Sequence, residues 1–594
     1  MDNQQIARIL HETAALLELD GAIIGRYRSY EKAADLIAGL PESVEQLVKT
    51  PEKLKELPGI GDRMVEHLQE ILKTGDYSLR AKLLKKYPPT LLEVLQLQSL
   101  GPKKVALLWK KFKAGTVADV ENLAKEGKLR DIAGFGEKSE QNILKAAAAF
   151  KRSTGRFHLN TVEAAAAALR GHIEKAGKTA ESVTPAGSLR RGRETVGDLD
   201  LLVTLAEGHT SQKHVDALAE HILTFPSIDQ KLAHGENKVS FTLRDGLQVD
   251  VRLLKKENFG AALLYFTGSK EHNVRLRGRA NDMGWTLNEY QLATLKGERH
   301  VAGRTEEEIY TKLKLDYIPP ELRENTGEIE AAEQHRLPQL IERGDIQGDL
   351  QMHSTASDGK NTVEEMALAA KSLGHKYIAM TDHSKAVTVA NGLDEKRMAA
   401  QAKMLREIDK QGLGIRVFVG SEVDILRDGT LDYSDETLAQ IDVVVCSVHS
   451  YMNLEAAEMT ERLLAAIENT YTQIIAHPSG RLLLRREAYP YDMEKVLDAC
   501  AKHGVAMECN SYPDRLDLKD VYLRMCKERG VRVVISTDSH STGNLQYIKY
   551  GVLTARRGWL TKADVLNTLP PQEFLAALRP KPGVAKAKQA GRSK

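Results

Sequence analysis

Two aspartates that follow a segment rich in glycine and arginine have the residue types and spacing needed to hold a phosphate ester with metal ions. Residues 186–203 open with Gly187 and Ser188, continue with two adjacent arginines and end in an alternating run that carries Asp198 and Asp200. Backbone N–H groups and guanidinium groups bind phosphate oxygens, and carboxylates bind Mg²⁺. The segment therefore has the parts that a nucleoside triphosphate needs.

The spacing of the carboxylates predicts that they gather on neighbouring strands. Asp198 and Asp200 are two residues apart in a predicted strand, so their side chains point to the same face. A third carboxylate, Asp250, lies in residues 249–254, which follow residues 238–243 across an Asp-Gly turn. This pattern predicts a hairpin that places Asp250 beside the first pair. Three such carboxylates suit a pair of Mg²⁺ ions, whereas an isolated Asp-x-Asp is more often a solvated strand face.

The order and spacing of these residues resemble the palm and nucleotide-binding subdomain of the family X DNA polymerases. The similarity covers roughly the first half of the chain and implies that a primer 3′-hydroxyl attacks the α-phosphate of a dNTP and releases pyrophosphate. It rests on Gly187-Ser188, Arg190-Arg191-Gly192, Gly197-Asp198-x-Asp200, Asp250-x-Arg252, residues 264–269 and residues 287–290.

The resemblance implies a role for each of these residues. Asp198 and Asp200 are expected to hold two Mg²⁺ or Mn²⁺ ions, and Asp250 to hold the ion next to the primer hydroxyl and to help remove its proton. The residues expected around the dNTP are Gly187, Ser188, Arg191 and Gly197 at the β- and γ-phosphates, Tyr265, Phe266 and Gly268 at the sugar, and Asn273 at the base edge. Arg277 is expected on the template. For Tyr265 and Phe266 the alternative is packing in the core.

Length and composition bound the remaining possibilities. A chain of 594 residues should hold several domains, and a net charge of +2 requires that DNA contacts come from local basic surfaces. Its four cysteines form no Cys-x-x-Cys pair, which indicates a reducing cytoplasm and argues against thiolate zinc sites. No run reaches the length of a membrane span, and the N-terminus lacks the features of a signal peptide. We therefore expect a cytoplasmic protein with no membrane partner, and the resemblance implies a monomer associated with the bacterial nucleoid.

Three short glycine turns punctuate a helical pattern in the first 150 residues, at 57–62, 97–102 and 132–137. Exposed N–H groups at the start of the helix after such a turn can bind a DNA phosphate without reading the base sequence. The turns resemble helix-hairpin-helix motifs, and the middle one is the weakest match; any one alone is more often an ordinary helix–helix turn. The turn glycines are Gly59, Gly61, Gly101, Gly134 and Gly136.

Residues 26–34 resemble the small N-terminal domain of the same polymerase family. In relatives with deoxyribose-phosphate lyase activity, a lysine after the first hairpin forms a Schiff base with the sugar. The corresponding position here is His67, and an imidazole cannot form this imine. We therefore expect no Schiff-base lyase activity, while Arg26, Lys32 and Arg63 are candidates to bind a 5′-phosphate at a gap.

From residue 348 onward, short apolar runs alternate with helical stretches, and the ends of the runs carry histidine, aspartate and glutamate. Alternation of this kind predicts a parallel barrel whose strand ends converge on one face. A single buried histidine is more often structural, but seven such ends in one domain favour a metal site. The runs are residues 349–353, 377–383, 417–422, 443–449, 474–477, 505–508 and 533–540.

This half is similar to the polymerase and histidinol phosphatase (PHP) domain of bacterial family X enzymes. Eight of the nine usual ligands match by type, and Gln351 stands where a histidine is expected. An amide oxygen is a weaker ligand of Mn²⁺ or Zn²⁺ than imidazole, so we expect one site of a trinuclear cluster to be weakened. The matching ligands are His353, Asp358, His383, Glu422, which is expected to bridge, His449, His477, Asp538 and His540.

Two outcomes remain open for this cluster. In the first, which we favour, the cluster keeps a reduced Mn²⁺-dependent 3′–5′ exonuclease and phosphoesterase activity. In the second, the cluster is only partly metallated and the domain mainly supports the structure. Arg481, Arg485 and Arg486, just after His477, are either DNA-phosphate ligands or part of a solvated basic loop.

The sequence thus predicts a multidomain α+β and α/β chain: helical helix-hairpin-helix domains at the N-terminus, a nucleotidyltransferase α+β palm and a C-terminal distorted (β/α)7 barrel. The linker is expected to contain some helix, and the basic tail to be disordered and to add affinity for DNA. The predicted boundaries are 1–80 and 81–155 for the helical domains, 156–255 for the palm, 256–318 for the nucleotide- and template-binding subdomain, 319–345 for the linker, 346–576 for the PHP domain and 577–594 for the tail.

The function predicted from these features is filling of short gaps in gapped or primed DNA during base excision repair, with dNTPs as substrates and a nuclease attached. One alternative is mainly a nuclease or phosphoesterase whose polymerase half only clamps DNA. The other is a non-catalytic gap-binding protein. The trio Asp198, Asp200 and Asp250 favours the polymerase, and Gln351 weakens the nuclease alternative.

Overall fold

Helices alone build the first quarter of the chain in the computed structural model, which describes residues 3–39, 43–55, 57, 59–95, 97, 100–130, 132, 135–152, 155–297, 299–484, 486 and 488–580. They share one apolar core, to which α1 contributes Ile6, Leu10 and Leu17 at helical spacing. The helices are α1 (Asn3–Leu19), α2 (Ile24–Gly39), α3 (Val44–Leu47), α4 (Pro51–Lys55), α5 (Asp62–Thr74), α6 (Ser78–Lys86), α7 (Leu91–Val94), α8 (Pro102–Phe112), α9 (Val117–Lys125) and α10 (Glu137–Arg152).

The predicted glycine turns precede three of these helices. Gly61 and Gly101 are the N-caps of α5 and α8, and neither cap makes a side-chain hydrogen bond. Gly59 has a φ of +90°, a conformation that favours glycine, and Gly136 is exposed just before α10. Gly134 lies outside the described residues. The first-turn N–H groups of α5 and α8 therefore face no capping side chain of their own.

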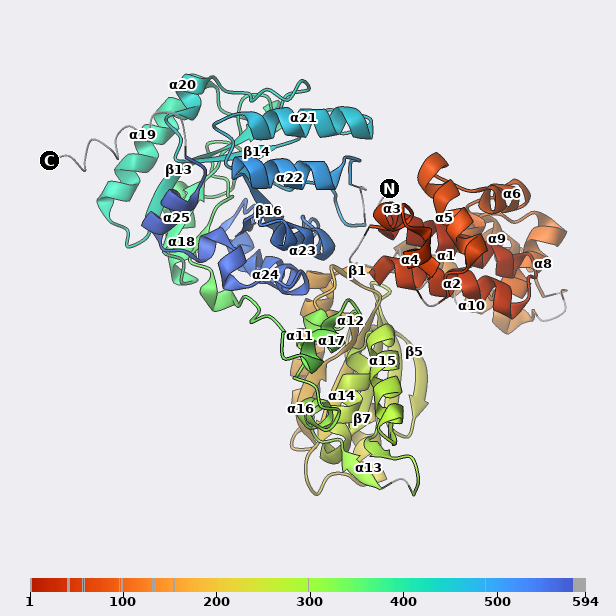
Figure 1. Cartoon of the computed structure of the whole chain (residues 1–594). Coiled ribbons are helices and arrows are strands. Elements are labelled where there is room, and N and C mark those ends of the chain that lie inside the picture. Colours follow the sequence, from red (N-terminus) through yellow and green to blue (C-terminus); the bar gives the residue numbers. More distant parts are fainter. Residues whose placement is uncertain are drawn as a thin grey trace.

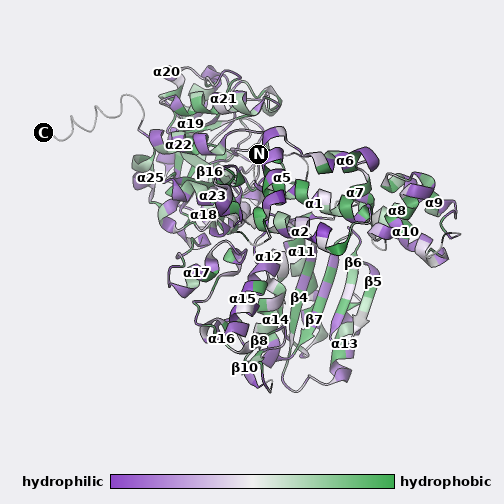
Figure 2. Cartoon of the chain, turned by 45° about the vertical axis from the view of Figure 1, so that its right-hand side comes forward, coloured by the Kyte–Doolittle hydropathy of each residue, from purple (hydrophilic) through white to green (hydrophobic). Residues whose placement is uncertain are grey.

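A five-stranded sheet carries the three aspartates, in the order β2-β4-β7-β6-β5. The strands β6 and β7 form the predicted hairpin, and β4 runs parallel to β7 with Asp200 directly opposite Asp250. Figure 2 shows β4, β7, β6 and β5 side by side, with hydrophobic and hydrophilic residues alternating along them. The strands are β2 (Ala180–Pro185), β4 (Asp198–Leu205), β5 (Ile228–Gly235), β6 (Lys238–Leu243) and β7 (Gln248–Leu254).

The two faces of this sheet have different covers. Leu199, Leu201 and Val203 pack in the core beneath α11 (Leu159–Ile173) and α13 (Gln212–Ile222). Leu202, which shares the face of Asp198 and Asp200 by alternation, packs against α14 (Phe259–Thr267). The helix α14 thus covers the far end of the aspartate face. The loop before β4 holds α12 (Gly187–Arg190) and β3 (Thr195–Val196), which pairs with β1 (Phe157–His158).

The segment after α14 forms a smaller unit with its own core. Residues 319–345, which the sequence marks as a polar linker with some helix, contain helix but pack into this unit: Arg323 is fully buried and Leu322 lies in the core. The remaining elements are α15 (Lys270–Asp282), β8 (Trp285–Leu287), β9 (Leu292–Thr294), β10 (His300–Ala302), α16 (Glu306–Lys312) and α17 (Glu328–Glu333).

Seven parallel strands in sequential order form the predicted barrel, and a bridge between Met352 and Ser539 nearly closes it. Phe574, from α25, packs in one core with strand residues that include Tyr377 and Phe418. The strands are β11 (Gly348–Asp349), β12 (Tyr377–Met380), β13 (Arg416–Asp424), β14 (Val443–Ser447), β15 (Ile474–Ile475), β16 (Ala506–Asn510) and β17 (Val533–Ser536). The helices are α18 (Val363–Ser372), α19 (Glu395–Gln411), α20 (Asp435–Leu438), α21 (Ala456–Glu468), α22 (Met493–His503), α23 (Asp520–Glu528), α24 (Ile548–Arg557) and α25 (Pro571–Ala577).

The barrel packs directly on the sheet-containing half. In Figure 1 the barrel (cyan and blue) lies above that half (yellow and green), and the N-terminal helices lie to the right. Tyr550 of α24 and Leu516 belong to the apolar cluster of the sheet. Among the described residues, the ion pairs that join a barrel cation to an acid of the other half include four that are at most 2.9 Å long: Lys549–Glu163 (2.6 Å), Arg481–Glu194 (2.8 Å), Arg556–Glu321 (2.7 Å) and Arg557–Glu324 (2.9 Å).

Arg481 and the start of the expected tail differ from the sequence expectation. Arg481 belongs neither to a solvated loop nor to a free DNA-binding surface, because it pairs with Glu194 and also donates to the carbonyl of Arg515. Arg486 donates to the carbonyl of Gly480, and Arg485 lies outside the described residues. Arg579 donates to the carbonyls of Ile467 and Asn469 on the barrel, whereas residues 581–594 are not among those described.

All four cysteines are free and buried. None of the helices formed by the described residues combines the length and the hydropathy of a bilayer-crossing segment.

Candidate active sites

The three aspartates of the sheet meet at its open face. Asp198 is exposed, Asp200 and Asp250 are half-buried, and strand register sets the latter two side by side on β4 and β7. Ser240, on the neighbouring β6, donates to Oδ1 of Asp250, and the Lys238 ammonium lies 3.1 Å from the same oxygen. These two contacts orient the Asp250 carboxylate.

Burial and the neighbouring carboxylates shift the pKa of Asp200. Burial, followed by the negative charges of Asp198 and Asp250, raises the pKa of Asp200 to about 7. Nearby like charges disfavour ionisation, so the cluster is short of positive charge. This donor set of hard carboxylate oxygens fits Mg²⁺ or Mn²⁺. Among the described residues, however, the triplets of His, Asp and Glu whose ligand atoms all lie within 4.8 Å of one another belong to the barrel.

The loop before β4 lies directly against the aspartates. Gly187 has a φ of +61°, and a Cβ at this position would lie 2.6 Å from Oδ2 of Asp200. Only glycine can occupy this place without displacing the carboxylate. The loop is also held from outside, because Arg557 of α24 donates to the main-chain oxygen of Arg191 at 2.9 Å.

The adjacent arginines of this loop have separate partners. Arg190 makes a two-pronged ion pair with Glu306, at 2.8 and 2.7 Å, and the same carboxylate also pairs with the buried Arg323. Arg191 donates instead to Glu324 at 3.0 Å and to the carbonyl of Thr267. The sequence does not indicate these partners, because they are distant along the chain. Glu306 and Arg323 lie more than 100 residues after Arg190, and Glu324 lies more than 100 residues after Arg191.

The residues expected at sugar, base and template also come together. Asn273 donates to the carbonyl of Tyr265 at 2.7 Å, and both line a small recess with Arg277 and Asn288. Gly268 approaches Arg191, with a hypothetical Cβ 3.1 Å from Nη1.

Phe266 has a packing contact of its own. Its ring lies on the guanidinium of Arg252, with Cζ 4.0 Å from the ring centroid, and meets the Tyr265 ring edge-on. Phe266 is half-buried, whereas Tyr265 is exposed. The core-packing alternative therefore applies to Phe266 more than to Tyr265.

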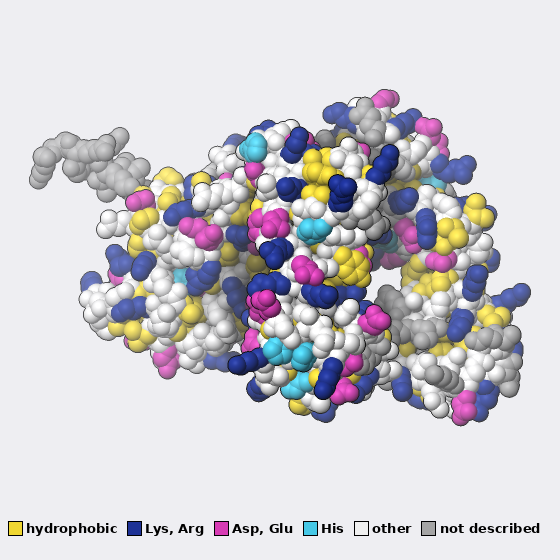
Figure 3. Space-filling model, turned by 90° about the horizontal axis from the view of Figure 1, so that it is seen from below, with side chains coloured by type: hydrophobic (Ala, Val, Ile, Leu, Met, Phe, Trp, Pro, Cys, Tyr) yellow, Lys and Arg dark blue, Asp and Glu magenta, His cyan; other side chains and the backbone are white. Residues whose placement is uncertain are grey.

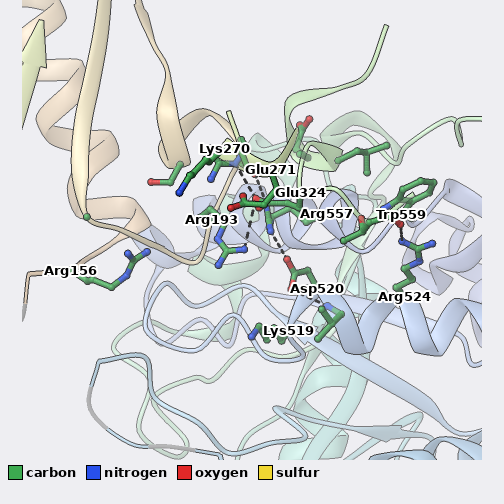
Figure 4. Close-up of a pocket in the computed structure, with 18 of the residues that line it drawn as sticks. Arg156, Arg193, Lys270, Glu271, Glu324, Lys519, Asp520, Arg524, Arg557 and Trp559 are labelled. Atoms are coloured by element: carbon green, nitrogen blue, oxygen red, sulfur yellow. Dashed lines mark hydrogen bonds and ion pairs between the residues drawn. The ribbon is translucent and has the colours of Figure 1, made fainter. Parts of the chain in front are cut away.

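A cavity of about 440 Å³ lies between this site and the barrel. The polymerase-like half lines it with residues that include Ser188, Arg191, Gly197 and Asp198. The barrel lines it with Lys519, Asp520, Val521, Arg524, Arg557 and Trp559. Figure 4 shows Lys270, Glu271 and Glu324 toward one side and Asp520 and Lys519 toward the other. These barrel residues carry no pattern by which the sequence assigns them to a nucleotide site.

The barrel brings its expected metal ligands together at the carboxyl ends of its strands. Three overlapping triplets or quartets have ligand atoms within 4.8 Å of one another. Glu422 is central, with His477 Nε2 at 2.8 Å, His449 Nε2 at 3.2 Å and His353 Nε2 at 3.4 Å from its oxygens. The groups are His353, Asp358, His383 and His540; His383, Glu422 and His449; and His353, Glu422 and Asp538.

Unpartnered polar atoms at this centre fit a metal cluster. His353, His383 and His477 each have an Nδ1 without a hydrogen-bond partner, as does Oε2 of Glu422, although all four side chains are buried. Buried polar atoms ordinarily find partners, and imidazole with carboxylate is a donor set suited to Mn²⁺ or Zn²⁺. Gln351 is fully buried with neither end of its amide paired.

Other residues support the ligands without having been assigned from the sequence. Burial lowers the pKa of His449, but the carboxylates of Glu422 and Asp424 outweigh it and raise this pKa to about 9. Asp424 accepts from His449 Nδ1 at 3.0 Å, the kind of contact that orients a metal-binding imidazole. Glu508, at a strand end that the sequence singles out, is fully buried, and burial raises the pKa of its carboxyl well above the ordinary value.

His67 lies in a tyrosine-lined position of the helical region. Its Nδ1 is 3.2 Å from the hydroxyl of Tyr30, and its ring centroid is 4.7 Å from that of Tyr77. Burial lowers the pKa of His67, which favours the neutral imidazole.

On the face seen in Figure 3, lysine and arginine side chains are interspersed with acidic ones. This distribution agrees with the small net charge of +2.

Comparison with protein families matches the chain to five family models in succession. They are a helix-hairpin-helix domain (residues 1–77), a SAM-like helix-hairpin-helix tandem (91–149), the DNA polymerase beta palm (159–245), the DNA polymerase beta thumb (262–324) and the PHP domain (349–512). The palm match includes the loop at Gly187 and the pair Asp198 and Asp200.

Among curated proteins, the chain is similar to the "DNA polymerase/3'-5' exonuclease PolX" of Bacillus subtilis (strain 168). The two are 36% identical over 581 residues, which cover 98% of this chain and 100% of that protein. A "Probable phosphatase" of Acetivibrio thermocellus is 33% identical over 203 residues, covering 32% of this chain and 78% of the phosphatase. A "Probable phosphatase" of Thermoanaerobacter sp. (strain X514) is 28% identical over 232 residues, covering 37% and 89% respectively.

Proposed function

The chain belongs to the family X DNA polymerases that carry a C-terminal PHP domain, and from this membership we propose that it fills short gaps in DNA during repair. Its substrates would be gapped or primed DNA and dNTPs. The observation that carries the proposal is the alignment of Asp200 with Asp250 on adjacent parallel strands, beside a glycine loop that touches Asp200.

Asp198, Asp200 and Asp250 would hold Mg²⁺ or Mn²⁺. Divalent cations bound there supply charge neutralisation for the phosphates and lower the pKa of an attacking hydroxyl. The pKa of about 7 at Asp200 supports this assignment, because burial and the charges of Asp198 and Asp250 outweigh the nearby Arg252 and Lys238. A bound divalent cation would let all three carboxylates ionise together.

The residues of the chain would position the reactants. Gly187, Ser188, Arg191 and Gly197 would bind the β- and γ-phosphates, and Asp250, oriented by Ser240 and Lys238, would accept the proton of the primer 3′-hydroxyl. Tyr265, Phe266 and Gly268 would lie against the sugar, Asn273 at the base edge and Arg277 on the template strand.

Primer extension on a duplex with a one-nucleotide gap tests this proposal. Asp250→Ala should abolish nucleotide addition while leaving affinity for the gapped DNA nearly unchanged. Asp216→Ala, which removes an exposed carboxylate from α13, is the matched control and should extend normally. Extension by the Asp250 variant at the wild-type rate would remove Asp250 from the active site.

For the barrel we propose a metal-dependent 3′–5′ exonuclease activity of reduced rate. His353, Asp358, His383, Glu422, His449, His477, Asp538 and His540 would hold Mn²⁺ or Zn²⁺, with Glu422 shared between ions. The unpartnered, buried nitrogens of His353, His383 and His477 support this ligand set. Gln351 stands two residues before His353, beyond the end of β11, and its buried amide has no partner at either end. This amide would weaken the site formed by His353, Glu422 and Asp538.

Restoring the histidine separates reduced activity from a purely structural cluster. Gln351→His should increase digestion of a 3′ end in Mn²⁺ and the Mn²⁺ content per chain after dialysis. Gln440→His, an exposed change on the barrel outside the ligand set, should change neither quantity. Equal digestion and equal metal content in Gln351→His and wild type would contradict the proposal.

We also propose that the helix starts after Gly61, Gly101 and Gly136 bind the DNA backbone, with the turn glycine Gly59 shaping the first hairpin. The uncapped N-termini of α5 and α8 support this role. The neutral, tyrosine-bound His67 would provide no Schiff-base lyase activity, because no primary amine stands in its place. We also propose that the protein acts as a monomer at the bacterial nucleoid.

A further inference from the structure

Nucleotide binding accounts for only one wall of the cavity between the proposed polymerase site and the barrel. Ser188, Arg191, Gly197 and Asp198 account for one wall. The opposite wall comes from the barrel, more than 300 residues later in the chain, and consists of the start of α23 and the end of α24. A volume of about 440 Å³ is large enough for a small anion such as a polyphosphate with its water.

Positive charge in this cavity exceeds what its acids neutralise. Asp520 pairs with Arg557 at 2.6 Å, and Glu324 accepts from both Arg557 and Arg191. Glu321 pairs with Arg556. The lining cations with little or no pairing are Arg193, whose nearest acid oxygen is 3.8 Å away, exposed Lys270, and Lys519.

Lys519 is the most unusual of these cations. Its ammonium makes no hydrogen bond or ion pair with any described residue, although the side chain is half-buried. The groups that act on it electrostatically are Glu194 and Asp520, which are acidic, and Arg481 and Arg193, which are basic; burial dominates and lowers the pKa of Lys519. Each nearby acid already pairs with an arginine. An ammonium left without a partner in such a place is suited to an anion that enters from outside.

Two helices direct their positive ends toward the same space. The first residues of α15, Lys270 and Glu271, and the first residues of α23, Asp520 and Val521, all line the cavity. Both helices are long enough to carry a dipole, with 13 and 9 residues. Helix N-termini bind phosphates through their free N–H groups. One helix comes from each half of the molecule.

We propose that Lys519 of the PHP barrel binds the polyphosphate chain of the nucleotide, so that the barrel completes the triphosphate site of the polymerase. This inference rests on the proposed polymerase function. The anion would lie between Ser188 and Arg193 of one half and Lys519 of the other, all of which line the cavity. Arg193 and Lys519 are labelled in Figure 4. The incoming triphosphate and the departing pyrophosphate both present phosphate anions to Lys519. Kinetics of nucleotide addition and of its reversal by pyrophosphate distinguish these two ligands.

Steady-state kinetics of the full chain on a one-nucleotide gap test the inference. Lys519→Ala should raise KM for the dNTP about tenfold with little change in kcat, the effect of losing one charge-assisted phosphate contact. Lys519→Arg should keep KM within about twofold, because the guanidinium retains the charge. Lys562→Ala, which removes an exposed barrel lysine outside the cavity, is the matched control and should behave as wild type.

The reverse reaction supplies the second arm, with inorganic pyrophosphate as the probe. A raised KM for both dNTP and pyrophosphate assigns Lys519 to the β- and γ-phosphates, and a raised KM for pyrophosphate alone assigns it to the leaving group; either result supports the inference. Unchanged KM values for both probes would overturn it. So would a loss of kcat in Lys519→Ala that is accompanied by a lower Tm and not rescued by Lys519→Arg, because that pattern marks a structural residue.

The controls keep this test separate from the test of the polymerase function. If wild-type protein does not extend the primer at all, the proposed function fails first. If wild type and Lys562→Ala extend it and Lys519→Ala shows an unchanged KM for both the dNTP and pyrophosphate, only the role of Lys519 fails. Digestion of a single-stranded 3′ end by the barrel should be equal in all four proteins.

Discussion

Gly187 shows how much of the proposed polymerase site depends on one residue without a side chain. Its left-handed backbone and its approach to Asp200 together bring the main chain of the loop before β4 against a carboxylate. A β-carbon here would meet an oxygen at 2.6 Å, which is closer than non-bonded atoms can pack, so either the loop or Asp200 would have to move.

We expect Gly187→Ala to reduce nucleotide addition by about 100-fold, since a shift of about 1 Å in a reacting group can cost this much. The matched control is Gly208→Ala, which has a similar φ of +79° but no atom within 4 Å of the added carbon. It should lose about 1–2 kcal/mol of stability from strain alone and keep its polymerase rate. Single-turnover extension rates measure both; equal rates in the two variants would show that the contact with Asp200 does not matter.

At the scale of elements, buried charge joins the loop before β4 to the following subdomain. Glu306, at the start of α16, accepts from Arg190 of α12 and from Arg323, which has no solvent exposure. Burial would raise the pKa of Glu306, but the two arginines outweigh it and lower this pKa to about 2. The carboxylate is therefore charged at neutral pH and balances the two cations.

Removal of this carboxylate charge should be costly. Glu306→Gln leaves the buried guanidinium of Arg323 and the half-buried one of Arg190 without compensation, and we expect it to destabilise the subdomain by about 3–5 kcal/mol. Native-state hydrogen exchange at the amides of α16 measures the change. Glu307→Gln, an exposed neighbour, should change the same amides by less than about 0.5 kcal/mol. Protection equal to wild type in Glu306→Gln would mean that the ion pairs contribute little.

Elements that depend on local sequence patterns could be predicted from the sequence, whereas contacts between residues far apart in the chain could not. The hairpin of β6 and β7 and the seven barrel strands were predicted because alternation and strand length are local properties. The partners of Arg190 and Arg191 were not, because adjacent and identical side chains bond to acids more than 100 residues away. The polar residues 319–345 read as a linker because composition does not reveal whether charges are paired and buried. The domain boundaries and the roles of the site residues stay predictions.

For the whole molecule, the boundary between the two halves is a complementary electrostatic surface. Barrel cations face acids of the polymerase half in all four ion pairs described above. Glu324 is the centre of one of them: burial would raise its pKa, but Arg193, Arg557 and Arg191 outweigh burial and lower it from 4.5 to about 2.

This shift gives the boundary a defined pH dependence. Because the folded-state pKa of Glu324 is the lower one, its contribution to stability is complete above about pH 4.5 and is lost progressively as the pH falls toward about 2. The difference in Tm between wild type and Glu324→Gln should therefore be constant from about pH 7 to about pH 5.5 and smaller at about pH 3.5.

The helix that follows Glu324, α17, offers a control for this measurement. Glu330→Gln removes an exposed carboxylate of α17 that pairs with the exposed Arg275. Its Tm should stay close to that of wild type at every pH. A difference between wild type and Glu324→Gln that widens as the pH falls would reverse the sign assigned to this carboxylate.

The hydrogen bond from Arg557 to the main-chain oxygen of Arg191 makes the two halves unequal in their tolerance of mutation. A peptide carbonyl survives any substitution at its own residue, whereas a guanidinium does not. Variation at position 191 can therefore alter nucleotide handling while the barrel keeps its hold on the loop. A substitution of Arg557 removes this hydrogen bond. We therefore expect such a change in the barrel to affect nucleotide addition before it affects the barrel's own activity.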